Sequence, residues 1–277
     1  MSPESFQHVV MTRFNLATPG RESAIRIRPG WLSGRFDLFE RYCLPSMAAQ
    51  TRQDFDWIVY FDVDTPASFR ERIERCREVR PFTPYYTPLF LSEGWPRSIR
   101  ETFGETAPRL LTTRLDNDDA LARDHVERLQ AAVAPFDGAR ASFNFTNGFL
   151  LNGGRVYAHR HPANAFASQL EPWGAETRTA SSIPHLDMAD YGPVIQIPGP
   201  GGWLQVIHDG NVSNRTAGRR VAPDAAQDRF PAEVLGDLAP FGPIEAMLDR
   251  FVEGPARAAR AGATRIAKRI LRRPSRL

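Results

Sequence analysis

The sequence has few cysteines and no long apolar run. Its 277 residues contain only Cys43 and Cys76, and their spacing matches no metal-binding motif. Two thiols fit buried side chains in a reducing compartment better than a disulfide scaffold. The chain has no run of roughly eighteen apolar residues, and no basic segment precedes an apolar run near its start. Neither a spanning helix nor a signal peptide is therefore expected, and we predict a cytoplasmic protein.

Acidic residues are absent from the range 257–276, which holds eight Arg or Lys. Setting these eight cations aside turns the net charge of +3 into −5, so the rest of the chain is mildly acidic. An acidic body argues against a nucleic-acid partner. With Ile266, Ile270 and Leu271 between its cations, the basic tail could lie on the anionic inner face of a membrane. A solvated C-terminus is the equally weighted alternative.

Strand-like and helix-like patterns alternate over the first half of the chain. Continuous apolar runs predict strands, and apolar residues at helical spacing predict helices. Strands are expected at 8–16, 56–62 and 110–116, and helices at 36–50, 67–79, 97–103 and 125–133. This order predicts an α/β core with a mainly parallel sheet. Ligands of such sheets bind beyond the carboxyl ends of the strands. The polar residues expected to meet there are Arg13, Asn15, Asp62, Asp64, Asp116 and Asp118.

The second half reads differently. The alternation from Ala141 onward and the turn at Asn152-Gly153-Gly154 predict a β-hairpin, and one more strand is expected near 203–207. The Pro/Gly-rich range 184–202 is expected to be a mobile active-site loop. We therefore predict a main domain over 1–215, a polar linker over 216–240 and a helical basic tail over 241–277.

An acidic cluster closes the third of these expected strands. Asp116, Asp118 and Asp119 stand within four residues, so their charges repel and raise one another's pKa unless a cation neutralises them. Mg²⁺ favours one or two carboxylates together with water and substrate phosphates. The alternative is an Asp-rich turn in which Asp118 or Asp119 only caps the following helix.

Two segments together carry a family resemblance. The first is a helix ending in Gln50-Thr51, followed by a buried strand that ends at Asp62; the second is RLDNDDAL with a helix beginning near Asp124. They resemble the two hallmarks of bacterial nucleotide-sugar glycosyltransferases of the GT-A fold. With Arg13-Phe14-Asn15 and the late WLQVIHDGNVSN, the chain resembles more narrowly a bacterial family of rhamnosyltransferases.

The resemblance implies a fold and a donor site. The fold would be α/β, with a Rossmann-like mixed sheet flanked by helices and a C-terminal helical extension. Asp116 and Asp118 would hold Mn²⁺ or Mg²⁺ and the diphosphate, with His208 as third metal ligand. Further candidates for binding the nucleotide-sugar are Arg13, Asn15, Asp62, Arg100, Arg114, Asp119 and Trp203. Asp119 could instead hold its loop, and Trp203 could anchor a loop rather than stack on the sugar.

The resemblance also implies an activity. It is the transfer of a sugar, with rhamnose suggested by the family name alone, from a nucleoside-diphosphate donor to a glycan or lipid-linked acceptor in polysaccharide biosynthesis. Inversion needs a base for the acceptor hydroxyl, and the candidates are Asp187, Asp190 and Asp209, with Asp187 preferred. Retention of configuration stays open. The alternatives are a nucleotidyltransferase of the sugar-nucleotide type and a non-catalytic protein that binds membrane surfaces.

Overall fold

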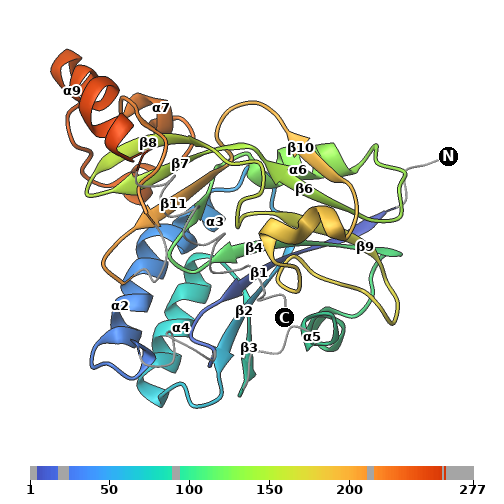
Figure 1. The fold of residues 1–277 in the computed structure, drawn as a ribbon. Helices are drawn as coiled ribbons and strands as arrows, with labels where there is room; N and C mark the ends of the chain where they lie inside the picture. Colours follow the sequence, from blue (N-terminus) through green and yellow to red (C-terminus); the bar gives the residue numbers. More distant parts are fainter. Residues whose placement is uncertain (1–4, 18–24, 89–93, 211–214, 258, 260–277) are drawn as a thin grey trace, which may run out of the picture.

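A mixed sheet lies at the centre of the computed structural model, which describes residues 5–17, 25–88, 94–210, 215–257 and 259 (Figure 1). Four parallel strands form one part: β1 (Phe6–Arg13), β2 (Asp56–Asp62), β3 (Thr83–Thr87) and β4 (Arg109–Asp116). Three later strands extend it: β6 (Ala141–Phe145), β9 (Ser168–Pro172) and β10 (Val194–Ile197). The order is β10-β6-β9-β4-β1-β2-β3, with β9 antiparallel to both its neighbours. The predicted mixed α/β sheet is confirmed.

Helices cover both faces of this sheet, so nearly every residue of β1, β2 and β4 is buried on whichever face it points to. On one face lie α2 (Trp31–Leu38), a π-helical stretch (Phe39–Cys43), α3 (Leu44–Ala48), α4 (Ala67–Val79) and α6 (His125–Val133). On the other face α5 (Gly94–Phe103) packs Trp95 and Ile99 against β1 and β2. The wide π turn ends at Cys43, two residues before Pro45, whose ring would clash with the carbonyl four residues earlier in a regular α-helix.

A second sheet of five described strands packs beside the first. Its members are β5 (Ala120–Leu121), β7 (Asn147–Asn152), β8 (Arg155–Arg160), β11 (Trp203–Ile207) and β12 (Arg219–Arg220). They are ordered β12-β8-β7-β11-β5. The predicted hairpin is β7–β8, which turns through Gly153 and Gly154 at positive φ. Because β6 belongs to the first sheet, the chain crosses between the sheets at Thr146.

Two predicted loops are corrected. The range 184–202 contains a short 3₁₀ helix, η2 (His185–Asp190), and strand β10, whose Ile195 and Ile197 lie opposite Phe143 and Phe145 of β6. The range therefore contains two regular elements and is not an irregular loop throughout. Isolated Ile residues between Pro and Gly hid a four-residue strand from the pattern.

The predicted polar linker 216–240 is wrong as well. It contains β12, α7 (Asp224–Gln227) and α8 (Ala232–Leu235). Phe230 and Val234 are fully buried against the second sheet and the π-helical stretch. The apolar residues of this segment are few and widely spaced, so composition alone made it look like solvent-exposed chain.

The predicted C-terminal helical extension begins at α9 (Pro243–Leu248) and continues through a π-helical stretch, η3 (Asp249–Glu253), to Arg257. Nearly all of the basic tail lies outside the described residues. Among the described helices, none combines the length and apolar character that a membrane span needs.

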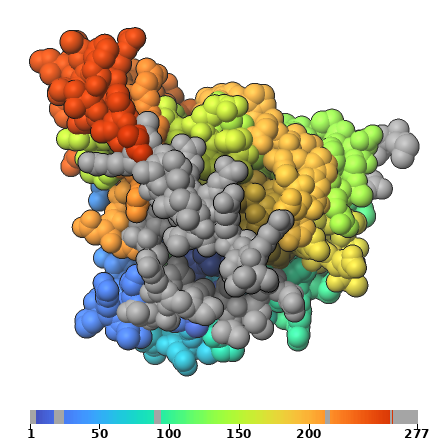
Figure 2. Space-filling model, viewed as in Figure 1, coloured from blue at the N-terminus to red at the C-terminus, as the bar shows by residue number. Residues whose placement is uncertain are grey.

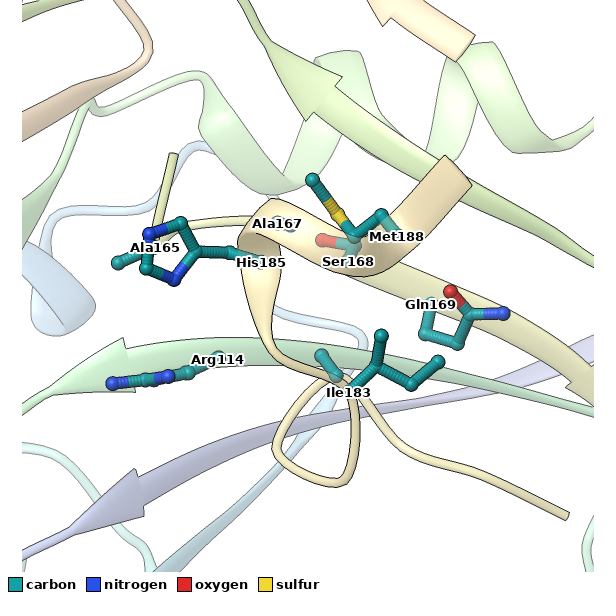
Figure 3. Close-up of a pocket in the computed structure, with 9 residues that line it drawn as sticks. Arg114, Ala165, Ala167, Ser168, Gln169, Ile183, His185 and Met188 are labelled. Atoms are coloured by element: carbon teal, nitrogen blue, oxygen red, sulfur yellow. The ribbon is translucent and has the colours of Figure 1, made fainter. Parts of the chain in front are cut away.

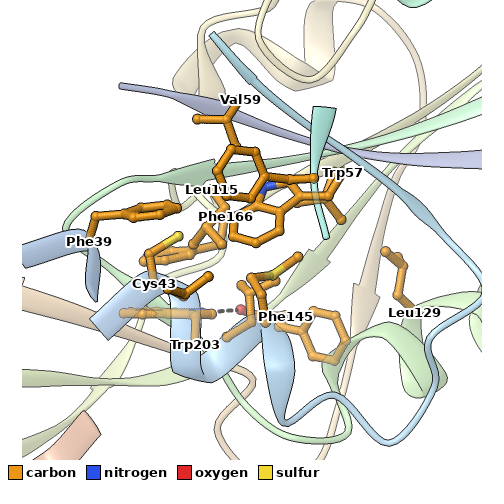
Figure 4. Close-up of a cluster of buried hydrophobic side chains, with 14 of the residues drawn as sticks. Phe39, Cys43, Trp57, Val59, Leu115, Leu129, Phe145, Phe166 and Trp203 are labelled. Carbon is orange, nitrogen blue, oxygen red and sulfur yellow. Dashed lines mark hydrogen bonds between the residues drawn. The ribbon is translucent and has the colours of Figure 1, made fainter. Parts of the chain in front are cut away.

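The two sheets meet in a core built around Trp203 (Figure 4). Its ring stacks on Phe166 at a centroid distance of 4.9 Å, and its Nε1 donates to the Phe145 carbonyl at 2.8 Å. The side chain is only 1% exposed. Trp203 therefore cannot stack on a sugar, which corrects its assignment to the donor site.

Gly148 gives a test of this core. A Cβ on Gly148 would overlap the Trp203 indole, so Gly148→Ala forces the ring or strand β7 to shift. We expect the free energy of unfolding in urea to fall by about 1–3 kcal/mol, as in other overpacked cores. Gly174→Ala is the matched control because its Cβ would meet open space. Equal stability of the two variants would contradict the tight contact.

Candidate active site

The carboxyl ends of three adjacent parallel strands bring the predicted polar residues together. β1 lies between β2 and β4, and Arg13 is in register with Asp116. Arg13 Nη2 lies 3.9 Å from an Asp116 oxygen. Asn15 Oδ1 accepts a hydrogen bond from the backbone N–H of Asp62 at 3.0 Å. Of the residues predicted to converge, the sheet therefore brings Arg13 to Asp116 and Asn15 to Asp62 at the ends of neighbouring strands.

Asp116 is held ionised by arginines. Burial pushes its pKa upward, but the charges of Arg114 and Arg13 outweigh burial and set the pKa at about 2. Arg114 Nη2 donates to Asp116 Oδ2 at 3.0 Å. The carboxylate and its arginines thus form a charged cluster that stays ionised at neutral pH.

Asp118 stands between two cationic or polar partners from distant parts of the chain. Its Oδ2 accepts hydrogen bonds from Arg35 Nη1 at 2.8 Å and from His208 Nε2 at 2.9 Å. Arg35 also donates to Asn117 Oδ1 at 3.3 Å. Sequence reasoning predicted Asp118 and His208 but missed Arg35, which comes from α2.

Asp119 faces the interior. It is 2% exposed, and its Oδ1 accepts a hydrogen bond from the Val206 N–H at 2.8 Å. Burial raises its pKa well above the usual range, and the charges of Asp118 and Asp116 raise it further. Of the two expected roles, only holding the loop against β11 fits this position, so its assignment to nucleotide-sugar binding is corrected.

The capping alternative for the acidic cluster is wrong. Neither Asp118 nor Asp119 caps a helix, since β5 follows them and α6 begins only at His125, with Asp124 at its N-cap.

A cavity of about 340 Å³ opens beside Asp62. Asn15, Arg26 and Trp31 line it together with Asp62. Arg26 Nη2 pairs with Asp62 Oδ2 at 2.7 Å, so the carboxylate is held at the rim by a cation that the sequence pattern did not single out. An aromatic ring, a carboxylate and an amide around one concave space suit a base with its ribose.

A smaller cavity, of about 10 Å³, lies between β9 and η2 (Figure 3). Its apolar wall includes Ile183 and Met188, and Arg114 and His185 are its charged or titratable members. Burial lowers the pKa of His185, and the Arg114 charge lowers it further. His185 is therefore neutral at pH 7 and is a site residue that sequence reasoning missed.

The three candidate bases are exposed. Asp187 and Asp190 lie on η2, whereas Asp209 follows β11. The charges of Asp116 and Asp187 partly oppose the lowering of the His185 pKa by burial and by Arg114. His185, on η2, is therefore close to both carboxylates, so η2 lies at the edge of the charged cluster.

Arg100 lies near the amino-terminal ends of the strands, opposite the carboxyl ends that carry Asp62 and Asp116, which corrects its assignment to the donor site. Its guanidinium stacks over Trp173 at 5.0 Å and pairs with Glu105. Trp173 directly follows Pro172, which is in register with Arg109 at the start of β4. The length of β4 therefore separates Arg100 from Asp116.

The model of the family described as "Putative rhamnosyl transferase" matches residues 7–220. The chain belongs to this family. Membership confirms the resemblance to a rhamnosyltransferase family. Among curated proteins, none matches the sequence.

Solved structures with a similar fold are distant. S. aureus TarS 1-349 in complex with UDP-GlcNAc has 9% identity and a TM-score of 0.48, covering 76% of this chain and 62% of that chain. A "putative nucleotide-diphospho-sugar transferase" from Desulfovibrio desulfuricans G20 has 14% identity and a TM-score of 0.38, covering 76% and 83%. This chain thus spans less than two thirds of the TarS chain.

The donor set around Asp118 fits a divalent cation with two protein ligands. Asp118 Oδ2 and His208 Nε2 are 2.9 Å apart, close to the roughly 3 Å between neighbouring ligands of an octahedral Mg²⁺ or Mn²⁺. Asp116, which was expected to bind the metal beside Asp118, is engaged with arginines instead. No group of three His, Cys, Asp or Glu is poised for a metal in the described part of the chain. The fit is to an ion completed by water and phosphate oxygens.

Proposed function

We propose that the protein moves a sugar, with rhamnose as the first candidate, from a nucleoside-diphosphate donor to a hydroxyl of a glycan or lipid-linked acceptor, with inversion. Family membership supports the class. The observation that carries the proposal is the charged cluster at the strand ends: Asp116 and Asp118 are interleaved with Arg13, Arg35 and Arg114 beside the Asp62 cavity.

In this proposal the Asp62 cavity takes the nucleoside and the arginines take the diphosphate. As the acceptor oxygen forms its bond to the anomeric carbon, the bond from that carbon to the diphosphate oxygen breaks and the diphosphate gains negative charge. Fixed guanidinium groups stabilise that charge more than they stabilise the bound donor, which lowers the barrier. Arg35 and Arg114 are the best placed, because carboxylates already orient both of them.

Asp118 and His208 are the residues that would hold Mn²⁺ or Mg²⁺. Such an ion, when bound, neutralises the leaving diphosphate as a Lewis acid. Arg35 would then turn from Asp118 towards the phosphates, because one carboxylate oxygen cannot keep all its present partners and also bind a cation.

The test of the proposal is release of nucleoside diphosphate. The purified protein is incubated with Mn²⁺ and a panel of UDP-, GDP- and dTDP-sugars, including the rhamnose donor, with Asp118→Ala as the control. Release from at least one donor, abolished in the variant, is expected. If no donor releases a nucleoside diphosphate, the proposal is wrong. Release of pyrophosphate from a nucleoside triphosphate would support the nucleotidyltransferase instead.

For the acceptor proton we propose Asp187, which lies on η2 and, like Arg114, is close enough to His185 for its charge to act on that ring. Asp187→Asn is expected to lower transfer to the acceptor about 10²-fold or more, while hydrolysis of the donor by water stays closer to wild type. Chromatography of both products measures the two rates. Asp190→Asn and Asp209→Asn are the matched controls, and a larger loss in either would move the base to that residue.

A further inference from the structure

The helix formed by α9 and η3 turns an apolar stripe to solvent. Five large apolar side chains recur at positions i, i+3, i+4, i+7 and i+8: Ile244, Met247, Leu248, Phe251 and Val252. Their exposed fractions lie between 49% and 71%. A surface helix usually buries such a stripe against its own domain, and a contiguous exposed one marks a binding surface.

The polar side of the same helix is what attaches it to the body. Asp249 is 3% exposed; its Oδ2 accepts from the Arg220 N–H at 3.0 Å, and its other oxygen pairs with Arg257. The Arg257 guanidinium lies over the Tyr157 ring at 4.9 Å. These contacts fix the rotation of the helix, so its apolar stripe points away from the protein. The helix projects at one corner of the molecule (Figure 2, red).

Charge identifies the occupant. The sequence that continues from this helix, 257–276, holds eight cations and no acid, whereas the rest of the chain carries −5. An apolar stripe followed by clustered cations complements acyl chains and anionic headgroups together. Pairing of two copies through the stripe would instead bring two such basic segments near each other, where they repel.

We propose that the α9–η3 stripe docks on the surface of an anionic lipid bilayer. The helix lies in the interface, with Phe251 and Met247 among the acyl chains and the basic segment near the headgroups. Asp249 and Arg257 set the orientation of the protein on that surface.

Vesicle flotation of the full chain tests the proposal. The protein is expected to float with vesicles of phosphatidylglycerol and phosphatidylethanolamine, and not with phosphatidylcholine alone. The double variant Met247→Ser, Phe251→Ser is expected to lower the partition coefficient about tenfold or more. Both side chains are exposed, so the fold is retained. Val79→Ser is the matched control, since Val79 is 60% exposed on α4 and is expected to leave binding unchanged.

Three outcomes would overturn the proposal. The first is that the double variant binds vesicles as well as the wild type, and the second is that the wild type does not bind phosphatidylglycerol vesicles. The third is that light scattering shows a wild-type dimer, that the double variant is a monomer, and that the wild type does not bind vesicles. The last would assign the stripe to a second copy. No donor sugar is present, so failure would leave the proposed transfer untouched.

Discussion

Replacing Asp118 by asparagine is expected to lower kcat for donor turnover roughly 10²–10³-fold. Asparagine keeps the shape and one acceptor oxygen, so Arg35 and His208 stay near their places, but the negative charge that orients them and would bind the cation is lost. The phosphate charge that develops in the transition state is then stabilised less, because the carboxylate that would hold the cation is gone. Steady-state release of nucleoside diphosphate, measured over a range of Mn²⁺ concentrations, gives the loss in kcat and any rise in the metal requirement.

The control for this variant is Asp54→Asn. Asp54 also pairs with an arginine, Arg52, but it precedes β2 and is exposed at the opposite edge of the sheet. The activity and the thermal midpoint of Asp54→Asn are expected to match those of the wild type. Wild-type kcat in Asp118→Asn, with both proteins folded by circular dichroism, would remove Asp118 from the site and with it the proposed metal pair.

The strand ends could be predicted because each strand carries its signal in a few adjacent residues. An apolar run followed by a carboxylate marks both β2 and β4, and parallel packing then brings Asp62 and Asp116 to one edge. Gln50 and Thr51 belong to the same readable pattern, and the structure gives the reason. Gln50 Nε2 donates to the Ala122 carbonyl and Thr51 N–H to that of Arg123, which ties the helix end to the segment after the acidic cluster.

The arginines could not be sorted from sequence in the same way. Arg35 reaches Asp118 across 83 residues, and Arg26 reaches Asp62 across 36, so no local spacing marks either. Arg100, in contrast, precedes β4 closely in sequence but lies at its starting end. Trp203 misled for a related reason: a tryptophan beside glycines suits a sugar platform or a core, and only the stacked Phe166 decides for the core.

Acidification is expected to destabilise the protein already below pH 6.5, above the range in which exposed carboxylates titrate. His8 and His125 are buried, and burial is the main cause that lowers the pKa of His8 to about 3 and that of His125 to about 4. Unfolded histidines bind a proton near pH 6.5. Below that pH these histidines bind protons in the unfolded state but not in the native state. Their contribution to the free energy of unfolding is therefore fully present above pH 6.5 and is lost as the pH falls towards 4.

The surroundings of the two rings explain why they stay neutral in the native state. His8 Nε2 lies 2.9 Å from Thr113 Oγ1, and its Nδ1 lies 3.1 Å from the amide nitrogen of Gln130. His125 Nδ1 donates to the Gly202 carbonyl at 2.7 Å, while its Nε2 is buried with no hydrogen-bond partner in the described structure. A second proton on either ring would therefore be a buried charge without an acceptor.

Two buried histidines give a slope of at most about 2.7 kcal/mol per pH unit between pH 6 and 4.5. His159, His161 and His185 add in the same direction, whereas Asp119 and Glu171, whose pKa values burial raises, oppose it. Asp116, with its pKa near 2, contributes only at lower pH. Urea unfolding at several pH values measures the slope. His125→Phe is expected to reduce it by about 1.4 kcal/mol per pH unit. Phe145→Leu is the control, because it removes the ring that His125 contacts but no titrating group. It is expected to lower the free energy of unfolding at every pH and to leave the slope unchanged. An equal slope in the wild type and both variants would show that His125 is not buried in its neutral form.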